Sequence, residues 1–260
     1  MTNTTIRLLM NRIFSLLFIL FLSSCTTVSH VAPDPSLLRI GVTPDLPPMI
    51  DKRAGKMVGV EADFANELAM ELGRDPVFLA MEWEELLPAL EKNDIDIVMS
   101  GMSITRARNF RVLFAHPYMT AGLTPLFRRG DYSPTGMYPS IVRHQTSVIG
   151  CVKGTTGAIY AKNAYVHAEV IEFSDWEDAL RGLHRENVHM LIHDAPAVWW
   201  AASQYETHFV AFPELLNEEK LAWAIAKTNP DLQAQVNNVL EEWQESGKGV
   251  EILKRWFPGM

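Results

Sequence analysis

Hydrophobic residues along this chain alternate between short continuous runs and longer stretches of helical period. The stretch from Val60 to Leu72 has an apolar residue at every fourth position, which predicts an amphipathic helix that ends at Gly73. Further helices are predicted at about 83–90, 155–165, 175–185, 195–204, 230–245 and 249–257. Short apolar runs, typical of buried strands, lie at 38–42, 77–80, 95–99, 148–152, 169–173, 188–192, 209–212 and 221–226. Alternation of this kind predicts parallel or mixed sheets that are flanked by helices.

The alternation occurs twice, once before about residue 120 and once after it. A chain of 260 residues is long for one compact core, and two sets of strands and helices suit two smaller lobes. We therefore predict an α/β fold of two lobes. Residues 128–144 contain glycine and proline without a clear period, so we expect an irregular loop there.

The N-terminal segment differs from the rest of the chain. Residues 1–24 carry two arginines, no acid and a short apolar run, which together predict a secretory signal peptide. The small residues directly before Cys25 resemble the lipobox of bacterial lipoproteins, in which the cysteine is acylated. We expect residues 25–36 to be a lipidated tether that holds the protein at a membrane without spanning it. An ordinary signal peptide with a chance cysteine is the alternative.

Charge and composition narrow the possible functions. The net charge of −8 argues against a nucleic-acid partner and against a polybasic membrane patch. Cys151 is the only cysteine after Cys25, so no disulfide is expected within the fold. His184, His189 and His193 are spread over a predicted helix, turn and strand, so we expect no metal site. We find no GxGxxG, P-loop, HExxH or GxSxG motif and expect no cofactor.

An ordered set of short motifs resembles the polar amino-acid family of periplasmic solute-binding proteins, also called bacterial extracellular solute-binding family 3. In the first half the resembling segments are 59–64, 83–90, 94–97, 100–108 and 114–118. The second half resembles the family more weakly, through 153–157, 193–196 and the Trp256-Phe257 ending. The resemblance covers nearly all of the chain after the signal segment.

This resemblance implies a type II periplasmic-binding-protein fold, in which two sheets flanked by helices are joined by two hinge strands. The hinges are expected near 118–122 and 218–222. Lobe 1 would comprise 37–121 and 222–260, and lobe 2 would comprise 122–221. The resemblance also implies function: a monomer, lipid-anchored in the periplasm or cell envelope, that binds a small amino-acid-like solute and delivers it to the membrane subunits of an ABC transporter.

The resemblance assigns the carboxylate of such a ligand to Arg108, whose guanidinium binds both oxygens. The hydroxyl of Ser103 and the backbone N–H groups of Gly101 and Ser103 would complete this anion site. If the motif is read in a different register, Arg106 takes this role. The other possibility for Arg108 is that it is a surface arginine that binds no ligand.

The second lobe is expected to contribute a turn and an acid. Thr155 and Thr156 lie between glycines at a predicted helix start and would bind the same carboxylate. Asp194 would bind the α-ammonium. The alternative for Thr155 and Asp194 is the same: each is also a good N-cap residue for the helix that follows it.

The side chain of the ligand is expected to pack on Trp83, whose alternative role is in the core. Leu46 lies where many family members have a second aromatic residue. Thr43 lies where members that bind cationic side chains often have an acid, so a cationic ligand would need a substitute, Asp45 or Glu61.

Two rival functions share the fold. Periplasmic dehydratases that act on prephenate or arogenate resemble this chain, but they carry an acid just after the glycine-threonine turn, where this chain has Ala158. A ligand-sensing module is the second rival, and such modules are usually fused to a transmembrane segment. We expect a binding protein and no catalysis.

Overall fold

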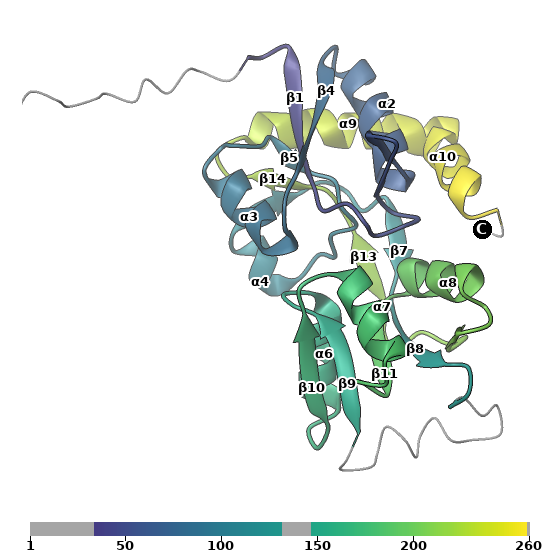
Figure 1. Cartoon of the computed structure of the whole chain (residues 1–260). Coiled ribbons are helices and arrows are strands. Elements are labelled where there is room, and N and C mark those ends of the chain that lie inside the picture. Colours follow the sequence, from purple (N-terminus) through teal and green to yellow (C-terminus); the bar gives the residue numbers. More distant parts are fainter. Residues whose placement is uncertain (1–33, 132–146, 259–260) are drawn as a thin grey trace, which may run out of the picture. The chain divides into compact units, whose positions relative to one another are not determined.

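The computed structural model describes residues 34–131 and 147–258 (Figure 1). The predicted signal peptide, Cys25, most of the tether and most of the predicted irregular loop lie outside these residues. Within the described residues, no helix is both long enough and apolar enough to cross a membrane.

The first sheet has five strands in the order β4-β1-β5-β14-β6. Its strands are β1 (Leu37–Val42), β4 (Asp75–Ala80), β5 (Ile97–Val98), β6 (Val112–Phe114) and β14 (Ala224–Ala226). β1 runs parallel to both β4 and β5, whereas β14 runs antiparallel to β5 and β6. A strand from near the C-terminus therefore completes a sheet that begins at the N-terminus.

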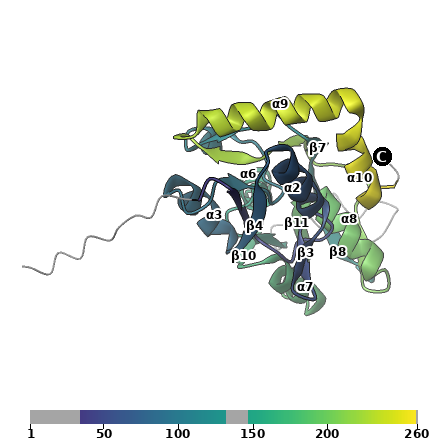
Figure 2. The same cartoon turned by 90° about the horizontal axis from the view of Figure 1, so that it is seen from above.

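Helices cover both faces of this first sheet because alternate strand residues face opposite ways. Ile97 packs beneath α2 (Val60–Glu71), α9 (Pro230–Ser246) and α10 (Lys248–Trp256), and Val98 packs beneath α3 (Trp83–Glu91). Figure 2 shows the chain turning sharply between α9 and α10. The turn is at Gly247, whose φ of 78° lies in the left-handed region that favours glycine.

The second sheet has five strands in the order β10-β9-β11-β8-β12. Its strands are β8 (Leu123–Arg128), β9 (Val148–Val152), β10 (Glu169–Phe173), β11 (Met190–Asp194) and β12 (Phe209–Ala211). Three strands are parallel, and β8 runs antiparallel to β11 and β12. α6 (Thr156–Ala164) covers one face, and α7 (Trp176–His184) and α8 (Ala195–Gln204) cover the other.

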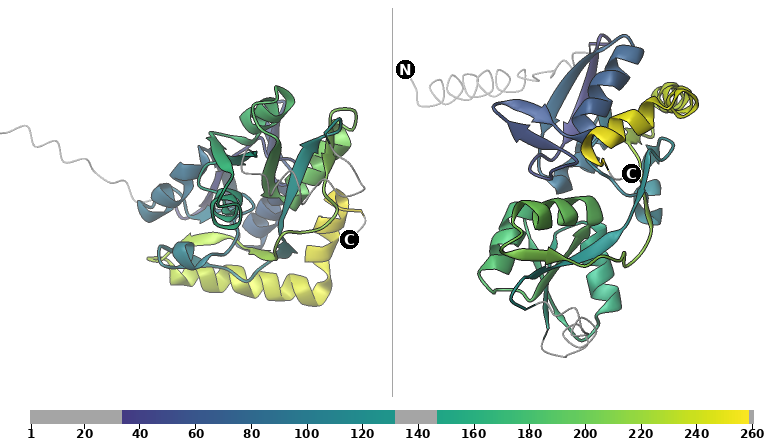
Figure 3. Two further views of the ribbon diagram at one scale, coloured as in Figure 1. Left: turned by 90° about the horizontal axis from the view of Figure 1, so that it is seen from below. Right: turned by 90° about the vertical axis from the view of Figure 1, so that its right-hand side faces the viewer.

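Two short strands join the two halves. β7 (Met119–Ala121) leads into β8, and β13 (Glu219–Leu221) leads back towards β14. They pair with each other in an antiparallel ladder, with Glu219 opposite Ala121 (Figures 1 and 3). Two helix-flanked sheets joined by two hinge strands confirm the predicted fold class.

Several elements differ from the sequence prediction. β5 keeps only two residues of the predicted 95–99 run. β11 begins and ends two residues later than predicted, so that Asp194 is its last residue. The predicted 221–226 strand is interrupted at Ala222 and Trp223, where the chain passes from β13 to β14. Strands this short depend on tertiary pairing, which a hydrophobic run alone does not specify.

Four strands were not predicted. β6 belongs to the first sheet and β8 to the second, and each runs antiparallel to the strands that it pairs with. β2 (Asp51–Arg53) pairs with β3 (Lys56–Val58) in a small hairpin. α4 (Arg106–Asn109) is a single helical turn that follows the loop after β5, where a helix starting near Thr105 was expected. Cys151, in β9, is buried and unpaired, and burial raises its pKa to about 12, which keeps it a thiol.

Candidate ligand-binding site

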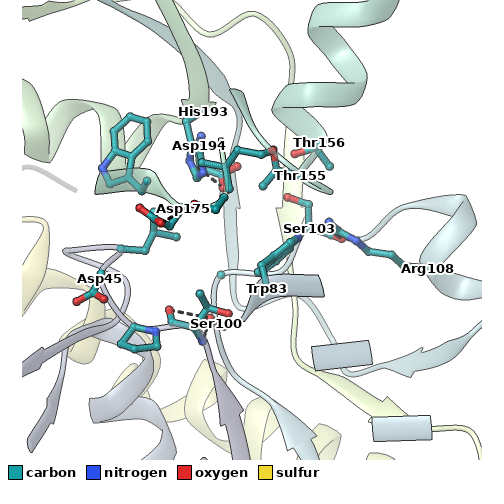
Figure 4. A pocket seen from close by; sticks show the side chains of 17 residues that line it. Asp45, Trp83, Ser100, Ser103, Arg108, Thr155, Thr156, Asp175, His193 and Asp194 are labelled. Atoms are coloured by element: carbon teal, nitrogen blue, oxygen red, sulfur yellow. Dashed lines mark hydrogen bonds and ion pairs between the residues drawn. The ribbon is translucent and has the colours of Figure 1, made fainter. Parts of the chain in front are cut away.

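All eight ligand-binding residues predicted from the sequence line one pocket, with contributions from both sheets and both lobes (Figure 4). They are Leu46, Trp83, Gly101, Ser103, Arg108, Thr155, Thr156 and Asp194. The rest of the lining is Thr43, Pro44, Asp45, Ser100, Val152, Ser174, Asp175, Trp176 and His193. Strand-end loops of the two sheets thus converge on this pocket, as is usual in open α/β folds.

Arg108 is held in place from several directions. Its side chain is 9% exposed, and its guanidinium donates to the Ser103 carbonyl at 2.8 Å and to the Gly154 carbonyl at 3.3 Å. The guanidinium lies 5.2 Å from the centre of the Trp83 ring. Burial lowers the pKa of Arg108, and the carboxylates of Asp194 and Glu219 oppose this shift. An arginine stays charged under such conditions, so Arg108 is a fixed cation in the pocket.

Arg106, the alternative in a different register, is exposed and lies over the Phe110 ring instead of lining the pocket. The third arginine of this segment, Arg111, is also exposed and forms an ion pair with Glu91 at 2.7 Å. Only Arg108, of these three, faces the pocket.

Gly101 differs from its predicted role. Its backbone N–H donates to the Glu61 carboxylate at 2.5 Å, so this donor is turned into the lobe-1 core and away from a ligand. The φ of 68° at Gly101 allows this orientation of the peptide. Ser103 lies in a β-bridge opposite Leu221 of the hinge strand β13. The Ser103 hydroxyl and N–H therefore remain as the predicted anion donors of this loop.

The hydroxyl groups of the second-lobe turn are engaged by the protein. Thr155 caps α6, since its hydroxyl accepts from Ala158 N–H at 3.4 Å and donates to the Val152 carbonyl at 2.7 Å. The Thr156 hydroxyl donates to Glu219 of β13 at 2.9 Å. The turn can therefore present its backbone N–H groups, at the N-terminus of α6, but not these two hydroxyls.

Asp194 is one of two pocket residues with a buried polar side-chain atom that has no hydrogen-bond partner within the described residues, and the other is Thr43. The Asp194 side chain is 14% exposed, and its Oδ1 atom has no hydrogen-bond partner within residues 34–131 and 147–258. It occupies the N-cap position of α8 without forming a side-chain cap bond, unlike Thr155. Burial raises its pKa to about 7, with a further increase from Glu219 that Arg108 partly offsets.

His193 precedes Asp194 and is buried beside it. Its Nδ1 accepts the Asp194 backbone N–H at 2.8 Å, and burial lowers its pKa to about 4. The imidazole is therefore neutral at physiological pH, and the 3.5 Å approach of Nδ1 to the Asp194 carboxylate is not an ion pair there. His193 shapes the pocket without offsetting the charge of Asp194.

Two indole rings face the pocket, one from each lobe. Trp83 begins α3, and its Nε1 donates across to the Gly154 carbonyl at 3.1 Å. Trp176 begins α7, is 6% exposed, and lies 4.7 Å from the His193 ring. Leu46 packs against the cores of both lobes. Trp176 thus provides the second aromatic ring of the pocket, which Leu46 does not supply.

The sequence reasoning did not identify Trp176, His193 or Glu219 as site residues. For His193 there was a local signal, since it directly precedes Asp194 at a strand end. For Trp176 the signal was the predicted capping residue Asp175, whose side chain accepts from Asp178 N–H at 2.7 Å and fixes the start of α7. Glu219 had no signal, because its proximity to the site arises from the pairing of the hinges.

Acids gather at one end of the pocket. Asp45 and Asp175 line it, and the pKa of Asp45 is raised by burial and by the nearby charges of Asp51, Glu177 and Asp175. Glu61, the other candidate substitute for an acid at position 43, is fully buried and does not line the pocket, so it does not replace that acid as a ligand contact. The lining therefore contains three aspartates and one arginine.

The fold is that of a solute-binding protein, and the pocket lies between its two lobes. The sequence model of "Bacterial extracellular solute-binding proteins, family 3" matches residues 38–259. The chain belongs to this family.

Known relatives agree with the assignment. The chain is 23% identical over 203 residues to the L-cystine-binding protein TcyJ of Escherichia coli, covering 78% of this chain and 75% of TcyJ. The crystal structure of an ancestral amino acid-binding protein, AncCDT-1, a precursor of cyclohexadienyl dehydratase, matches with a TM-score of 0.79 and 30% identity, covering 85% of this chain and 96% of that one. A putative binding component of an ABC transporter from Wolinella succinogenes, complexed with lysine, matches with a TM-score of 0.80 and 27% identity, again over 85% and 96%.

Proposed function

We propose that this protein binds an α-amino acid as a zwitterion in the pocket between its lobes. The observation that carries the proposal is the pairing of two buried, oppositely charged groups. Arg108 comes from lobe 1 and Asp194 from lobe 2, and they lie close enough for each to shift the pKa of the other. An amino acid offers the carboxylate and the ammonium that these two groups lack.

The chemistry of each contact follows from the available donors and acceptors. The guanidinium of Arg108, the hydroxyl and N–H of Ser103 and the N-terminal N–H groups of α6 would bind the carboxylate. The ammonium would donate to Asp194, whose Oδ1 is buried and otherwise unpartnered. Because the anion site is mainly on lobe 1 and the acid on lobe 2, one ligand satisfies both only when the lobes are together, so binding favours closure.

We further propose that the side chain of the ligand is cationic, as in lysine or arginine. The lining provides three aspartates against one arginine, so a zwitterion alone offers Asp45 and Asp175 no counter-charge within the pocket. The indoles of Trp83 and Trp176 would stabilise a cation by roughly 0.5 to 2 kcal/mol. The lysine bound in the Wolinella succinogenes protein supports this choice.

In this proposal the protein delivers its ligand to an ABC-type importer, as the names of several relatives suggest. It would do so in the periplasm or cell envelope, as a monomer tethered through the lipid on Cys25.

The dehydratase alternative receives no support from position 158. Ala158 is buried, carries no proton donor and does not line the pocket.

The experiment is a thermal-melting screen of the purified protein with lysine, arginine, glutamine, glutamate, cystine and prephenate. A ligand at 100 times its dissociation constant stabilises the folded state by about 2.7 kcal/mol, which is a clear rise in Tm. We expect the largest rise with lysine or arginine and none with glutamate. A rise with prephenate followed by its turnover would instead support the enzyme.

A further inference from the structure

Glu61 is a buried acid that the ligand site does not use directly. It is the second residue of α2 and is 0% exposed. Its Oε1 accepts from the Gly101 N–H at 2.5 Å and from the Tyr118 hydroxyl at 2.6 Å, and its Oε2 accepts from the Trp223 indole N–H at 2.9 Å. Three donors therefore converge on one carboxylate.

These donors come from three functionally different segments. Gly101 belongs to the loop that faces the ligand pocket. Tyr118 directly precedes the hinge strand β7, and Trp223 lies between the hinge strand β13 and β14. Glu61 is thus hydrogen-bonded to the ligand-facing loop and to both hinge segments at once.

The aromatic rings of the hinge segments are packed around this carboxylate. Tyr118 and Trp223 stack with ring centres 5.3 Å apart, and Phe64, one turn along α2, packs against each at 5.3 and 5.5 Å. A shift of either hinge segment relative to α2 would therefore disturb both the aromatic stack and the hydrogen bonds of Glu61.

A carboxylate is a costly choice for this position if packing alone is required. Burial raises the pKa of Glu61, the three hydrogen bonds oppose that rise, and no lysine or arginine contributes to it. The position in the first turn of α2 offers a favourable interaction with the helix dipole, which a partly exposed acid there, such as Asp63, obtains without full burial. Only an acceptor with two oxygens serves all three donors.

The bond to Gly101 also sets the orientation of the pocket loop. In a trans peptide the N–H and the preceding C=O point in opposite directions. Turning the Gly101 N–H towards Glu61 therefore turns the Ser100 carbonyl the other way. The loop that carries Ser103 and leads to Arg108 has its peptide planes fixed from beneath by Glu61.

We propose that Glu61 is a positioning residue that couples the ligand-facing loop to both hinge segments, so that hinge geometry and the shape of the anion site change together. Where it concerns ligand affinity, this inference rests on the function proposed above. The coupling itself is a property of the protein without ligand.

The test is hydrogen exchange of the ligand-free, full-length protein, comparing Glu61→Gln with Leu68→Ala. Glutamine keeps the shape of the side chain but turns one acceptor into a donor. Leu68 is fully buried in the same helix and the same lobe-1 core, and it serves as the matched control. We expect at least tenfold faster exchange in Glu61→Gln at residues 100–104, 119–121 and 219–223. Leu68→Ala should instead raise exchange along α2 and α9, with these three segments no faster than the rest of the lobe.

Trp223→Phe provides a second test if Glu61→Gln does not fold. It keeps an aromatic ring and removes one donor to Glu61. Trp223 is hydrogen-bonded to Glu61 and not to Gly101, so an effect on the loop of Gly101 would be transmitted by Glu61. We expect exchange at residues 100–104 to rise by about threefold, because the carboxylate that holds Gly101 is less constrained. Unchanged exchange at 100–104 in these variants, or the same pattern in Leu68→Ala, would overturn the coupling.

Calorimetric titration with L-lysine, at a temperature at which all variants are folded, connects the coupling to the site. We expect Glu61→Gln to weaken binding at least tenfold and Leu68→Ala to leave it within threefold. Faster exchange with unchanged affinity would refute the link to the ligand site. If lysine does not bind even the original protein, the proposed ligand fails, while the exchange measurement still decides whether the loop and hinges are coupled.

Discussion

The two sides of the pocket differ in how completely the protein satisfies their charged groups. On the lobe-1 side, Gly101 is bonded to Glu61 and Arg108 to the Ser103 carbonyl, and the polar atom left buried without a partner is a neutral hydroxyl, that of Thr43. On the lobe-2 side, Asp194 has a buried oxygen without a partner and a pKa raised to about 7. The first side is built in advance, whereas the second retains a group that is destabilising until something binds it.

This difference indicates where a ligand contributes most. A buried acceptor without a donor costs roughly 1–3 kcal/mol, and a ligand ammonium removes that cost. Asp194 and Thr155 both occupy N-cap positions, but only Thr155 forms the cap bond. The missing cap at Asp194 is therefore a sign of function, since a residue with a purely structural role would use its side chain as Thr155 does.

The largest expected effect on ligand affinity comes from the lobe-1 side of the pocket, where Arg108 is held in place. Arg108→Ala should weaken binding of the amino-acid ligand by about 3 kcal/mol or more, at least roughly 100-fold, because the ligand carboxylate would be buried without its cation. Calorimetric titration measures this loss. Arg106→Ala removes an exposed arginine two residues away and should change the dissociation constant less than about twofold. Equal losses in the two variants would refute the assignment.

On the lobe-2 side, replacing Asp194 is expected to have a smaller effect on ligand affinity and an opposite, favourable effect on stability. Asp194→Asn should weaken binding by less than Arg108→Ala does, yet it should stabilise the ligand-free protein at pH 8 by about 1–3 kcal/mol, since a buried carboxylate is replaced by a neutral amide of the same shape. Urea unfolding without ligand measures the second effect. A ligand-free protein that is markedly less stable would mean that Asp194 is a structural residue.

The pKa of Asp194 predicts how pH acts on both quantities. Its folded-state pKa of about 7 lies above the ordinary aspartate value of 3.8. As pH rises from about 4 to 7 the unfolded chain loses this proton before the folded chain does, so the stability contribution falls by about 1.4 kcal/mol per unit. Ligand affinity should rise, by up to about tenfold per unit between pH 5 and 7, because only the ionised carboxylate binds the ammonium.

His193 should not disturb this profile, since its pKa of about 4 keeps it neutral over the range. Glu219, which raises the pKa of Asp194, offers a control, because Glu219→Gln should move the affinity profile to lower pH. Titrations from pH 5 to 8 measure the profile. An affinity that is constant over this range would contradict a carboxylate–ammonium contact at Asp194.

The smallest effect concerns a contact at the rim. Lys153 of lobe 2 and Glu84 of lobe 1 form an ion pair at 2.9 Å, and both side chains are exposed. Such pairs contribute about 0–1 kcal/mol. Lys153→Gln should therefore change ligand affinity by less than about fivefold, far less than Arg108→Ala, and a larger change would mean that closure depends on the rim more than on the ligand.

How far the sequence predicts this molecule depends on the range of the interactions involved. The helix at Val60–Glu71 and the strand at Val148–Val152 follow from local periodicity, and both were predicted nearly to the residue. Arg108 was distinguished from Arg106 by the order of motifs, because periodicity does not tell the two apart.

The remaining features depend on contacts between distant segments. The Gly101 N–H was predicted to face the ligand, but it faces Glu61, forty residues earlier in the chain. Trp176 reaches the site at the start of a helix, for which the capping residue Asp175 was the local signal, whereas Glu219 reaches it through the pairing of two hinges and leaves no pattern in its own segment. Hydrophobic periodicity indicates which face of an element is buried, but not which distant side chain it meets.

The central claim, that Arg108 and Asp194 hold the two ends of a zwitterion, is tested most directly with blocked ligands. The measurement is calorimetric titration of the original protein with the amino acid that gives the largest rise in Tm, with its α-methyl ester and with its Nα-acetyl derivative. The account predicts that each blocked form binds at least about 100-fold more weakly, because each leaves one buried charge unpaired. Binding of either blocked form as tightly as the free amino acid would contradict it.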